Sequence, residues 1–161
     1  PPNTNFDDLE FFYGRGSPND PATCLQHRTT QGQFKRRNAK GGKNHVRAAQ
    51  LLIVLLYSFW EHEYRPKLAE ALGLANPNEL RMPLFGEIRE LRNDVLHHHG
   101  VVTRETVKKL LVFSNVQENK EIILTEITVG LLIGHIKEAI DNLVTDAGLE
   151  DPKYRTVWHF Q

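Results

Sequence analysis

The 161-residue sequence predicts an all-α protein, and three amphipathic segments carry that prediction. Apolar residues recur every three or four positions in segments that begin near Asn44, Pro83 and Thr125, which is the spacing of one helix face. The single cysteine, Cys24, excludes an intramolecular disulfide and a cysteine-built zinc site. We expect a basic, loop-rich arm over residues 1–43, a helical domain over residues 44–148 and a tail over residues 149–161.

The first long helix should begin at Asn44 and be largely buried. Its apolar positions wrap most of the circumference, so it should lie at the centre of a bundle or face a second subunit as well as its own core. Pro66 should end or kink it, with a further turn or two over residues 68–72. The apolar positions are Val46, Ala49, Leu52, Ile53, Leu56, Phe59 and Trp60.

The remaining segments follow the same logic. A helix should begin near Pro83, which suits a first turn, and stop at Gly100. Residues 103–109 fit a short helix. The two apolar runs 110–113 and 121–124 flank a polar stretch, so we expect a small β-hairpin near residues 110–124. A last long helix should follow Thr125 as its cap and end at Gly148. The core faces of the two long helices are Leu84, Ile88, Leu91 and Val95, and Val129, Leu132, Ile133, Ile136, Ile140, Leu143 and Val144.

Charge is distributed unevenly along the chain, although basic and acidic residues both number 20. From Gly14 to Arg47, eight basic residues stand against one acidic residue, which gives +7 and leaves −7 for the rest. Such a segment can attract a phosphate backbone locally, and a solvated extension without a specific partner explains the same charge. The residues that we expect to contact RNA are Lys35, Arg36, Arg37, Lys40 and Lys43.

Several functional classes are disfavoured. The longest apolar run, residues 51–57, is far shorter than the ~20 residues that a membrane span needs, and no signal peptide precedes it, so we expect a cytoplasmic protein. Gly41-Gly42-Lys43 lacks the spacing of a Walker phosphate loop, which argues against nucleotide hydrolysis.

The densest chemical cluster lies late in the second long helix. Asn93 and His97 are one turn apart, and the long Arg92 side chain can reach the same side although it starts roughly 140° away. An arginine can bind a scissile phosphate and a histidine can move protons near neutral pH, so this pair suits phosphodiester cleavage without a metal or cofactor. RNA supplies its own nucleophile, the 2′-hydroxyl. Because one histidine can hardly be base and acid at once, a symmetric dimer is chemically attractive.

Two other interpretations compete for these residues. His97, His98 and His99 invite a metal site, but successive helical positions point about 100° apart and cannot converge on one ion. His98 could instead pair with Asp94 on the surface. The alternative for Arg92 is an ordinary solvated ion-pair face with its neighbours. The members of that face would be Glu87, Arg89, Glu90, Arg92 and Asp94.

The spacing Arg92-Asn93-x-x-x-His97 resembles the R-polar-x-x-x-H signature of the HEPN family, and the resemblance covers roughly residues 44–147. It implies a bundle of four or five helices, usually a homodimer with paired motifs in an interface cleft. Many members are metal-independent endoribonucleases of toxin–antitoxin or phage-defence systems. Carried over, Arg92 and His97 would be catalytic and Asn93 would orient them.

The rival hypothesis comes from a different class. Some family members have lost activity, so the same helices could form a non-catalytic dimeric module that binds RNA, a nucleotide or a protein partner such as an antitoxin. An isolated regulatory subunit of a longer assembly is a third hypothesis. Substitution of Arg92 or His97 separates the first two, since only an enzyme has cleavage to lose.

Overall fold

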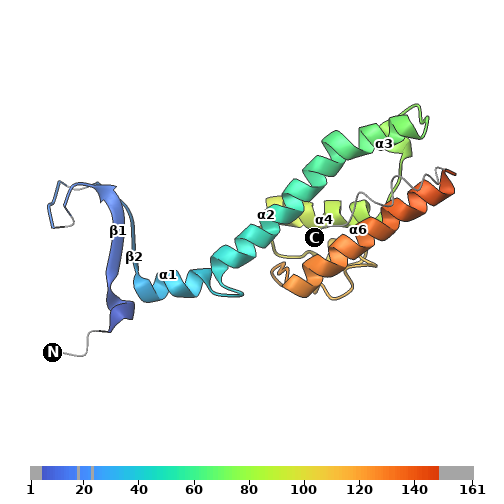
Figure 1. The fold of residues 1–161 in the computed structure, drawn as a ribbon. Coiled ribbons are helices and arrows are strands. Elements are labelled where there is room, and N and C mark those ends of the chain that lie inside the picture. The colour runs from blue at the N-terminus through green and yellow to red at the C-terminus, as the bar shows by residue number, and fades with distance from the viewer. Residues whose placement is uncertain (1–4, 18, 23, 149–161) are drawn as a thin grey trace, which may run out of the picture. The chain divides into compact units, whose positions relative to one another are not determined.

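The computed structural model describes residues 5–17, 19–22 and 24–148 (Figure 1). The chain forms two compact units, residues 1–49 and 50–161, and the division falls inside helix α2 (Lys43–Phe59). It is mainly helical, as the sequence predicts, with one two-stranded sheet among the described residues. Within these ranges, no helix combines the length and apolar content that crossing a membrane requires. The predicted tail, residues 149–161, lies outside the described residues.

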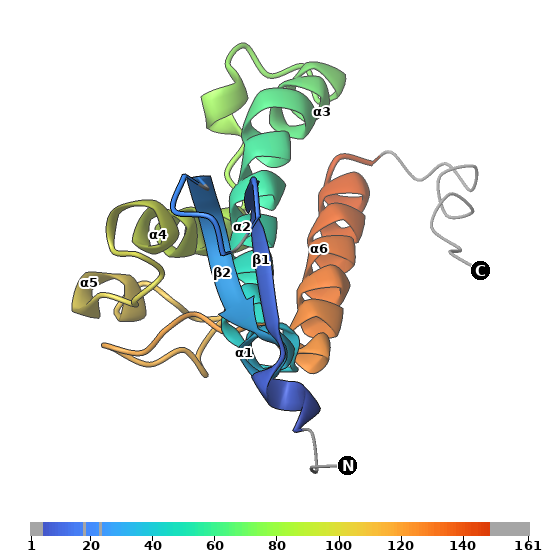
Figure 2. The same ribbon diagram turned by 90° about the vertical axis from the view of Figure 1, so that its left-hand side faces the viewer.

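The N-terminal unit contains regular structure where the sequence led us to expect loop. A 3-10 turn, η1 (Phe6–Asp8), precedes strand β1 (Glu10–Arg15), which pairs antiparallel with β2 (Cys24–Thr30) (Figure 2). Helix α1 (Gln31–Asn38) follows at once, started by a capping box between Thr30 and Gln33. The expectation was wrong because glycine, proline and charge dominate the segment's composition and conceal an aromatic run of high β-propensity at residues 11–13.

The first long helix of the prediction begins at Lys43 as α2 and does not stop at Pro66. It continues through a five-residue π-turn, η2 (Trp60–Tyr64), into α3 (Arg65–Ala71). A proline ring clashes with the carbonyl four residues earlier in a regular α-helix, and the wider turn in front of Pro66 relieves that clash. At the predicted end or kink, the structure has a π-turn directly before Pro66 and a continuing helix after it.

Helix α4 (Pro83–His97) begins and ends close to the predicted limits. A short 3-10 turn, η3 (Pro77–Glu79), leads into it, and His99 and Gly100 adopt left-handed conformations just after its end. The last helix, α6 (Glu126–Asp146), is capped by the Thr125 hydroxyl, which accepts the amide N–H of Thr128. Gly148, at φ +65°, stands where the stop was predicted.

The predicted hairpin near residues 110–124 is wrong. The described part of the chain instead holds the short helix α5 (Arg104–Val107) and an isolated bridge between Val101 and Glu121. Residues 110–113 fold in turns, because Leu110 and Phe113 enter the core and the Glu87 carboxylate binds the amides of residues 112 and 113. Two short apolar runs about a polar stretch fit this arrangement as well as a hairpin.

The core of the second unit joins its helices to this irregular segment. The Trp60 and Phe85 rings stack at 3.9 Å with 7° between their planes and so connect η2 to α4. Helix α6 contacts α4. The buried apolar residues are Ile53, Trp60, Ala69, Leu80, Leu84, Phe85, Ile88, Leu91, Val102, Leu110, Phe113, Ile122, Leu124 and Leu132.

Candidate functional site

The outer face of α4 carries the residues that the sequence singles out. Leu84, Ile88 and Leu91 are buried on the inner face, as predicted, whereas Val95, predicted with them, is half-buried. Arg92 and Asn93 are half-buried and His97 is exposed at the last position of the helix. Consequently, the polar constellation is directed away from the core, as the helical spacing predicts.

Arg92 and Asn93 are in direct contact. The Arg92 Nη1 atom donates a hydrogen bond of 3.1 Å to Asn93 Oδ1. This bond draws the guanidinium around the helix toward the face on which His97 follows Asn93 by one turn. Among the described residues, the His97 side chain has no hydrogen-bond or ion-pair partner and is exposed, so its imidazole is accessible to a ligand.

A tyrosine from α2 completes the surroundings of Arg92. The Arg92 guanidinium carbon lies over the Tyr57 ring, 5.8 Å from its centroid, and the Tyr57 hydroxyl donates to Glu61 Oε2 at 3.0 Å. Burial raises the pKa of the Tyr57 phenol, and the hydrogen bond to the Glu61 carboxylate and its charge raise it further, against smaller opposing effects of Arg89 and Arg65. The phenol is therefore neutral at physiological pH and acts as a hydrogen-bond donor.

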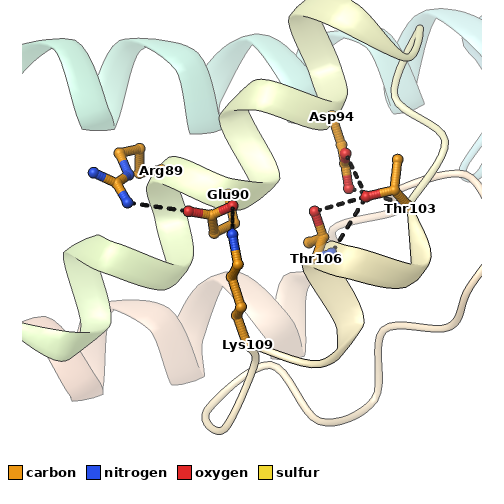
Figure 3. Close-up of polar contacts among 6 residues, drawn as sticks. All are labelled: Arg89, Glu90, Asp94, Thr103, Thr106 and Lys109. Carbon is orange, nitrogen blue, oxygen red and sulfur yellow. Dashed lines mark hydrogen bonds and ion pairs between the residues drawn. The ribbon is translucent and has the colours of Figure 1, made fainter.

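The opposite side of α4 is fastened to the chain that follows (Figure 3). The buried Asp94 carboxylate accepts the Thr103 amide at 3.0 Å and the Thr103 hydroxyl at 3.2 Å, and that hydroxyl accepts the amide of Thr106. Glu87, also buried, accepts the amides of Val112 and Phe113. Satisfied carboxylates of this kind hold α4 in place.

These contacts correct two sequence interpretations. Glu87 and Asp94 are buried anchors and do not belong to a solvated ion-pair face. The proposed pairing of His98 with the Asp94 side chain is also wrong, because Thr103 occupies that carboxylate and His98 contributes its backbone N–H to the Asp94 carbonyl. Of the five predicted members, Arg89 and Glu90 fit the ion-pair interpretation, because they pair with each other.

Glu90 lies between two cations. It accepts Lys109 Nζ at 2.9 Å and Arg89 Nη2 at 3.2 Å (Figure 3). Burial raises the pKa of the Glu90 carboxyl, but the two cations together lower it by more, so the net pKa lies below its usual value. Arg89 starts on the same outer face as Asn93, one turn earlier, and its side chain is 57% exposed.

The turn after His97 is held from inside the bundle. Gly100 at φ +80° packs against the buried Gln50 side chain, and a Cβ at this position would lie 2.2 Å from Gln50 Nε2. The same amide donates to the Ile122 carbonyl at 3.3 Å, while the Ile122 amide donates to the Gly100 carbonyl at 2.8 Å. The C-terminal end of α4 therefore has a defined position.

The basic residues expected to contact RNA belong to the N-terminal unit. Lys35 forms a 2.8 Å ion pair with Asp7, and this hydrogen bond and the charge of Lys35 lower the pKa of the Asp7 carboxyl. Arg28 pairs with Glu10. With the acids before Gly14 included, residues 5–47 hold eight basic and four acidic side chains, or +4. Arg36, Arg37, Lys40 and Lys43 are exposed.

No metal site is found in the described ranges. Within residues 5–17, 19–22 and 24–148, no three His, Cys, Asp or Glu side chains gather so that they could hold an ion. His97, His98 and His99 are all exposed.

Sequence reasoning missed Tyr57 and left Glu61 without a role. The spacing of Tyr57 and Glu61, i and i+4, places them on one helix face and was the available signal. The contact of Tyr57 with Arg92 joins α2 to α4, and the sequence pattern of neither helix predicts it.

In comparisons with family models, curated proteins and solved structures, nothing matches this chain. The likeness to the HEPN family therefore rests on Arg92, Asn93 and His97 and on their setting at the end of a helix.

Proposed function

We propose that this protein is a metal-independent endoribonuclease of the HEPN type. The observation that carries the proposal is the contact of the Arg92 guanidinium with Asn93, one helical turn before the exposed His97. An arginine, an amide and an imidazole along one face match the needs of a phosphodiester whose own 2′-hydroxyl attacks the phosphorus.

Arg92 would bind the scissile phosphate. Its guanidinium is held by an amide oxygen and an aromatic ring, and in the described residues it forms no ion pair with a carboxylate. Its positive charge is therefore not neutralised by the protein. The N–H groups that Asn93 does not use can bind phosphate oxygens, where negative charge builds up in the transition state.

His97 would transfer protons to and from the reacting oxygens. The reaction needs a base for the 2′-hydroxyl and an acid for the departing 5′-oxygen, and products carry a 2′,3′-cyclic phosphate and a 5′-hydroxyl. Because one imidazole does not serve both roles in a single step, a homodimer that brings two motifs together is part of the proposal.

A separate reason to expect a second copy is the outer face of α2, on the side of the helix away from Tyr57. Leu51, Leu55 and Phe59 are 55%, 45% and 52% exposed, on the side opposite to the buried Ile53 and Trp60. A helix that is apolar on both faces needs a cover on each. The exposed cations of the N-terminal unit would add contacts to the RNA backbone.

The decisive test is cleavage of labelled single-stranded and structured RNA in excess chelator. The unaltered protein should release fragments that end in cyclic phosphate, and Arg92→Ala and His97→Ala should abolish cleavage while the circular dichroism spectrum and the oligomeric state stay unchanged. If no RNA is cleaved in a mutation-sensitive way, the enzyme proposal fails and the non-catalytic binding module takes its place.

A further inference from the structure

Neutral groups fix the position of the Arg92 guanidinium. On one side Asn93 Oδ1 accepts its Nη1–H at 3.1 Å, and on the other the Tyr57 ring lies 5.8 Å from the guanidinium carbon. The face of an aromatic ring attracts a cation without neutralising it. These two contacts restrict the Arg92 side chain and leave its positive charge available to an anion. A carboxylate partner would neutralise that charge.

The Tyr57 ring is itself held in place through its hydroxyl. Glu61 accepts the hydroxyl at 3.0 Å and also accepts Arg65 Nη1 at 3.2 Å. Arg65 donates in turn to the carbonyls of Leu80 and Asn78, at 3.3 and 3.4 Å. A chain of contacts thus leads from the loop before α4 to the ring beneath Arg92. The charge of Glu61 is offset by Arg65, so it does not compete for Arg92.

The π-turn η2 lies within this series of contacts. Glu61 lies inside η2 and Arg65 directly after it, and both side-chain contacts join residues four positions apart. π-turns occur frequently at functional sites.

We propose that Tyr57 is a positioning residue for Arg92, and that Glu61 and Arg65 act through Tyr57 by holding its hydroxyl. The inference rests on the proposed function and extends it, because it assigns the orientation of the phosphate-binding arginine to a second helix. Tyr57 thereby restricts the orientation of the guanidinium that binds the scissile phosphate in the proposed function.

The test compares Tyr57→Leu, which removes the ring, with Tyr57→Phe, which keeps the ring and removes the hydroxyl. Tyr64→Leu is the matched control, since Tyr64 lies in the π-turn that follows α2, is 56% exposed and has no ring contact among the described residues. Cleavage in excess chelator gives kcat and KM. The side-chain Nε–Hε signal of Arg92, assigned by its loss in Arg92→Lys, reports the ring contact by NMR.

Tyr57→Leu should lower kcat roughly three- to tenfold with a smaller change in KM, because a cation–π contact of partly buried groups is lost. Tyr57→Phe, which frees the ring from Glu61, should lower kcat by a smaller factor than Tyr57→Leu, and Tyr64→Leu should leave kcat unchanged. The Arg92 signal should shift in Tyr57→Leu and stay in place in Tyr64→Leu. An unchanged kcat together with an unchanged Arg92 signal in Tyr57→Leu would overturn the inference.

Two further outcomes are covered. If Tyr57→Leu does not fold, Glu61→Ala replaces it: the released hydroxyl should shift the Arg92 signal and lower kcat, and no change in either again contradicts a positioning role. If the unaltered protein cleaves no RNA, the proposed function fails, and the Arg92 signal alone decides whether Tyr57 holds the arginine.

Discussion

Replacement of Gly100 by alanine tests the turn that holds the end of α4. Gly100 lies at φ +80°, and left-handed backbone costs an L-residue about 1–2 kcal/mol. The new methyl group would also lie 2.2 Å from Nε2 and 2.6 Å from Cδ of Gln50, which is 1% exposed and has no room to move away. Overpacking of a buried site costs about 1–3 kcal/mol. Gly100→Ala should therefore lower the free energy of unfolding by about 2–5 kcal/mol.

Substitution of two other glycines separates the backbone cost from the cost of the clash with Gln50. Gly73 lies at φ +68°, and a methyl group added there would meet nothing within 4 Å, so Gly73→Ala should cost only the backbone term of about 1–2 kcal/mol. Gly86 lies inside α4 with open space around it, and Gly86→Ala should stabilise the protein by about 0.5–1 kcal/mol. Urea denaturation at 25 °C measures all three, provided that the slope with denaturant is unchanged.

A double-mutant cycle with Gln50→Ala identifies the clash. Gln50→Ala removes the side chain that the methyl group would meet, so the two changes together should cost less than their sum by about 1–3 kcal/mol. The reasoning is refuted if Gly100→Ala costs no more than Gly73→Ala, or if the pair adds to within about 0.5 kcal/mol.

Three further predictions concern charge and assembly. The pKa of Glu90 is lowered in the folded protein, so this carboxylate stabilises the fold at neutral pH. The stabilisation is lost as the pH falls from the usual pKa range of a glutamate through the folded pKa. Glu90→Gln should therefore flatten the acid limb of a plot of unfolding free energy against pH. Arg89→Ala should weaken RNA binding and lower the slope of log affinity against log salt by about 0.7, as expected for one lost phosphate contact. The control is Lys108→Ala, which should leave the slope unchanged, because the Lys108 side chain is as exposed as that of Arg89 but lies next to α5. Leu55→Glu, on the outer face of α2, should convert the proposed dimer to a monomer by light scattering, and an unaltered protein that is already monomeric at micromolar concentration would contradict the dimer.

The helices could be predicted because their determinants are local. Periodic apolar residues, Pro83 at a start and Thr125 at a cap lie within the segments that they shape. The hairpin at β1 and β2 was missed because a count of charge, glycine and proline over more than 30 residues conceals the run Phe11-Phe12-Tyr13. The hairpin expected near residues 110–124 failed for another reason: Leu110 and Phe113 are apolar to fill the core and not to pair strands.

The candidate site also has a part that is local in sequence and a part that is not. The spacing of Arg92, Asn93 and His97 is a property of one helix and is visible in the sequence. The place of Tyr57 beside Arg92 depends on how α2 is rotated against α4, and the Trp60–Phe85 stack is one of the contacts that join the two parts of the chain. Contacts of that kind join residues far apart in sequence, and the pattern of either helix alone does not specify them.

The inner side of α4 holds the helix in place and the outer side carries the proposed reactive groups, so mutations on the two sides should have different effects. On the inner side, Glu87 and Asp94 bind backbone amides. Loss of either carboxylate leaves buried or part-buried donors without these partners, at a cost of up to about 1–3 kcal/mol for a buried group. On the outer side, Arg92 and His97 contact few groups of the protein, so their truncation should cost little stability. Changes on the inner side should thus lower stability and cleavage together, while changes on the outer side lower cleavage alone. A loss of cleavage without a loss of stability is expected for a helix whose outer face carries catalytic residues. It is not expected for an ordinary surface helix, whose outer face has no role in a reaction.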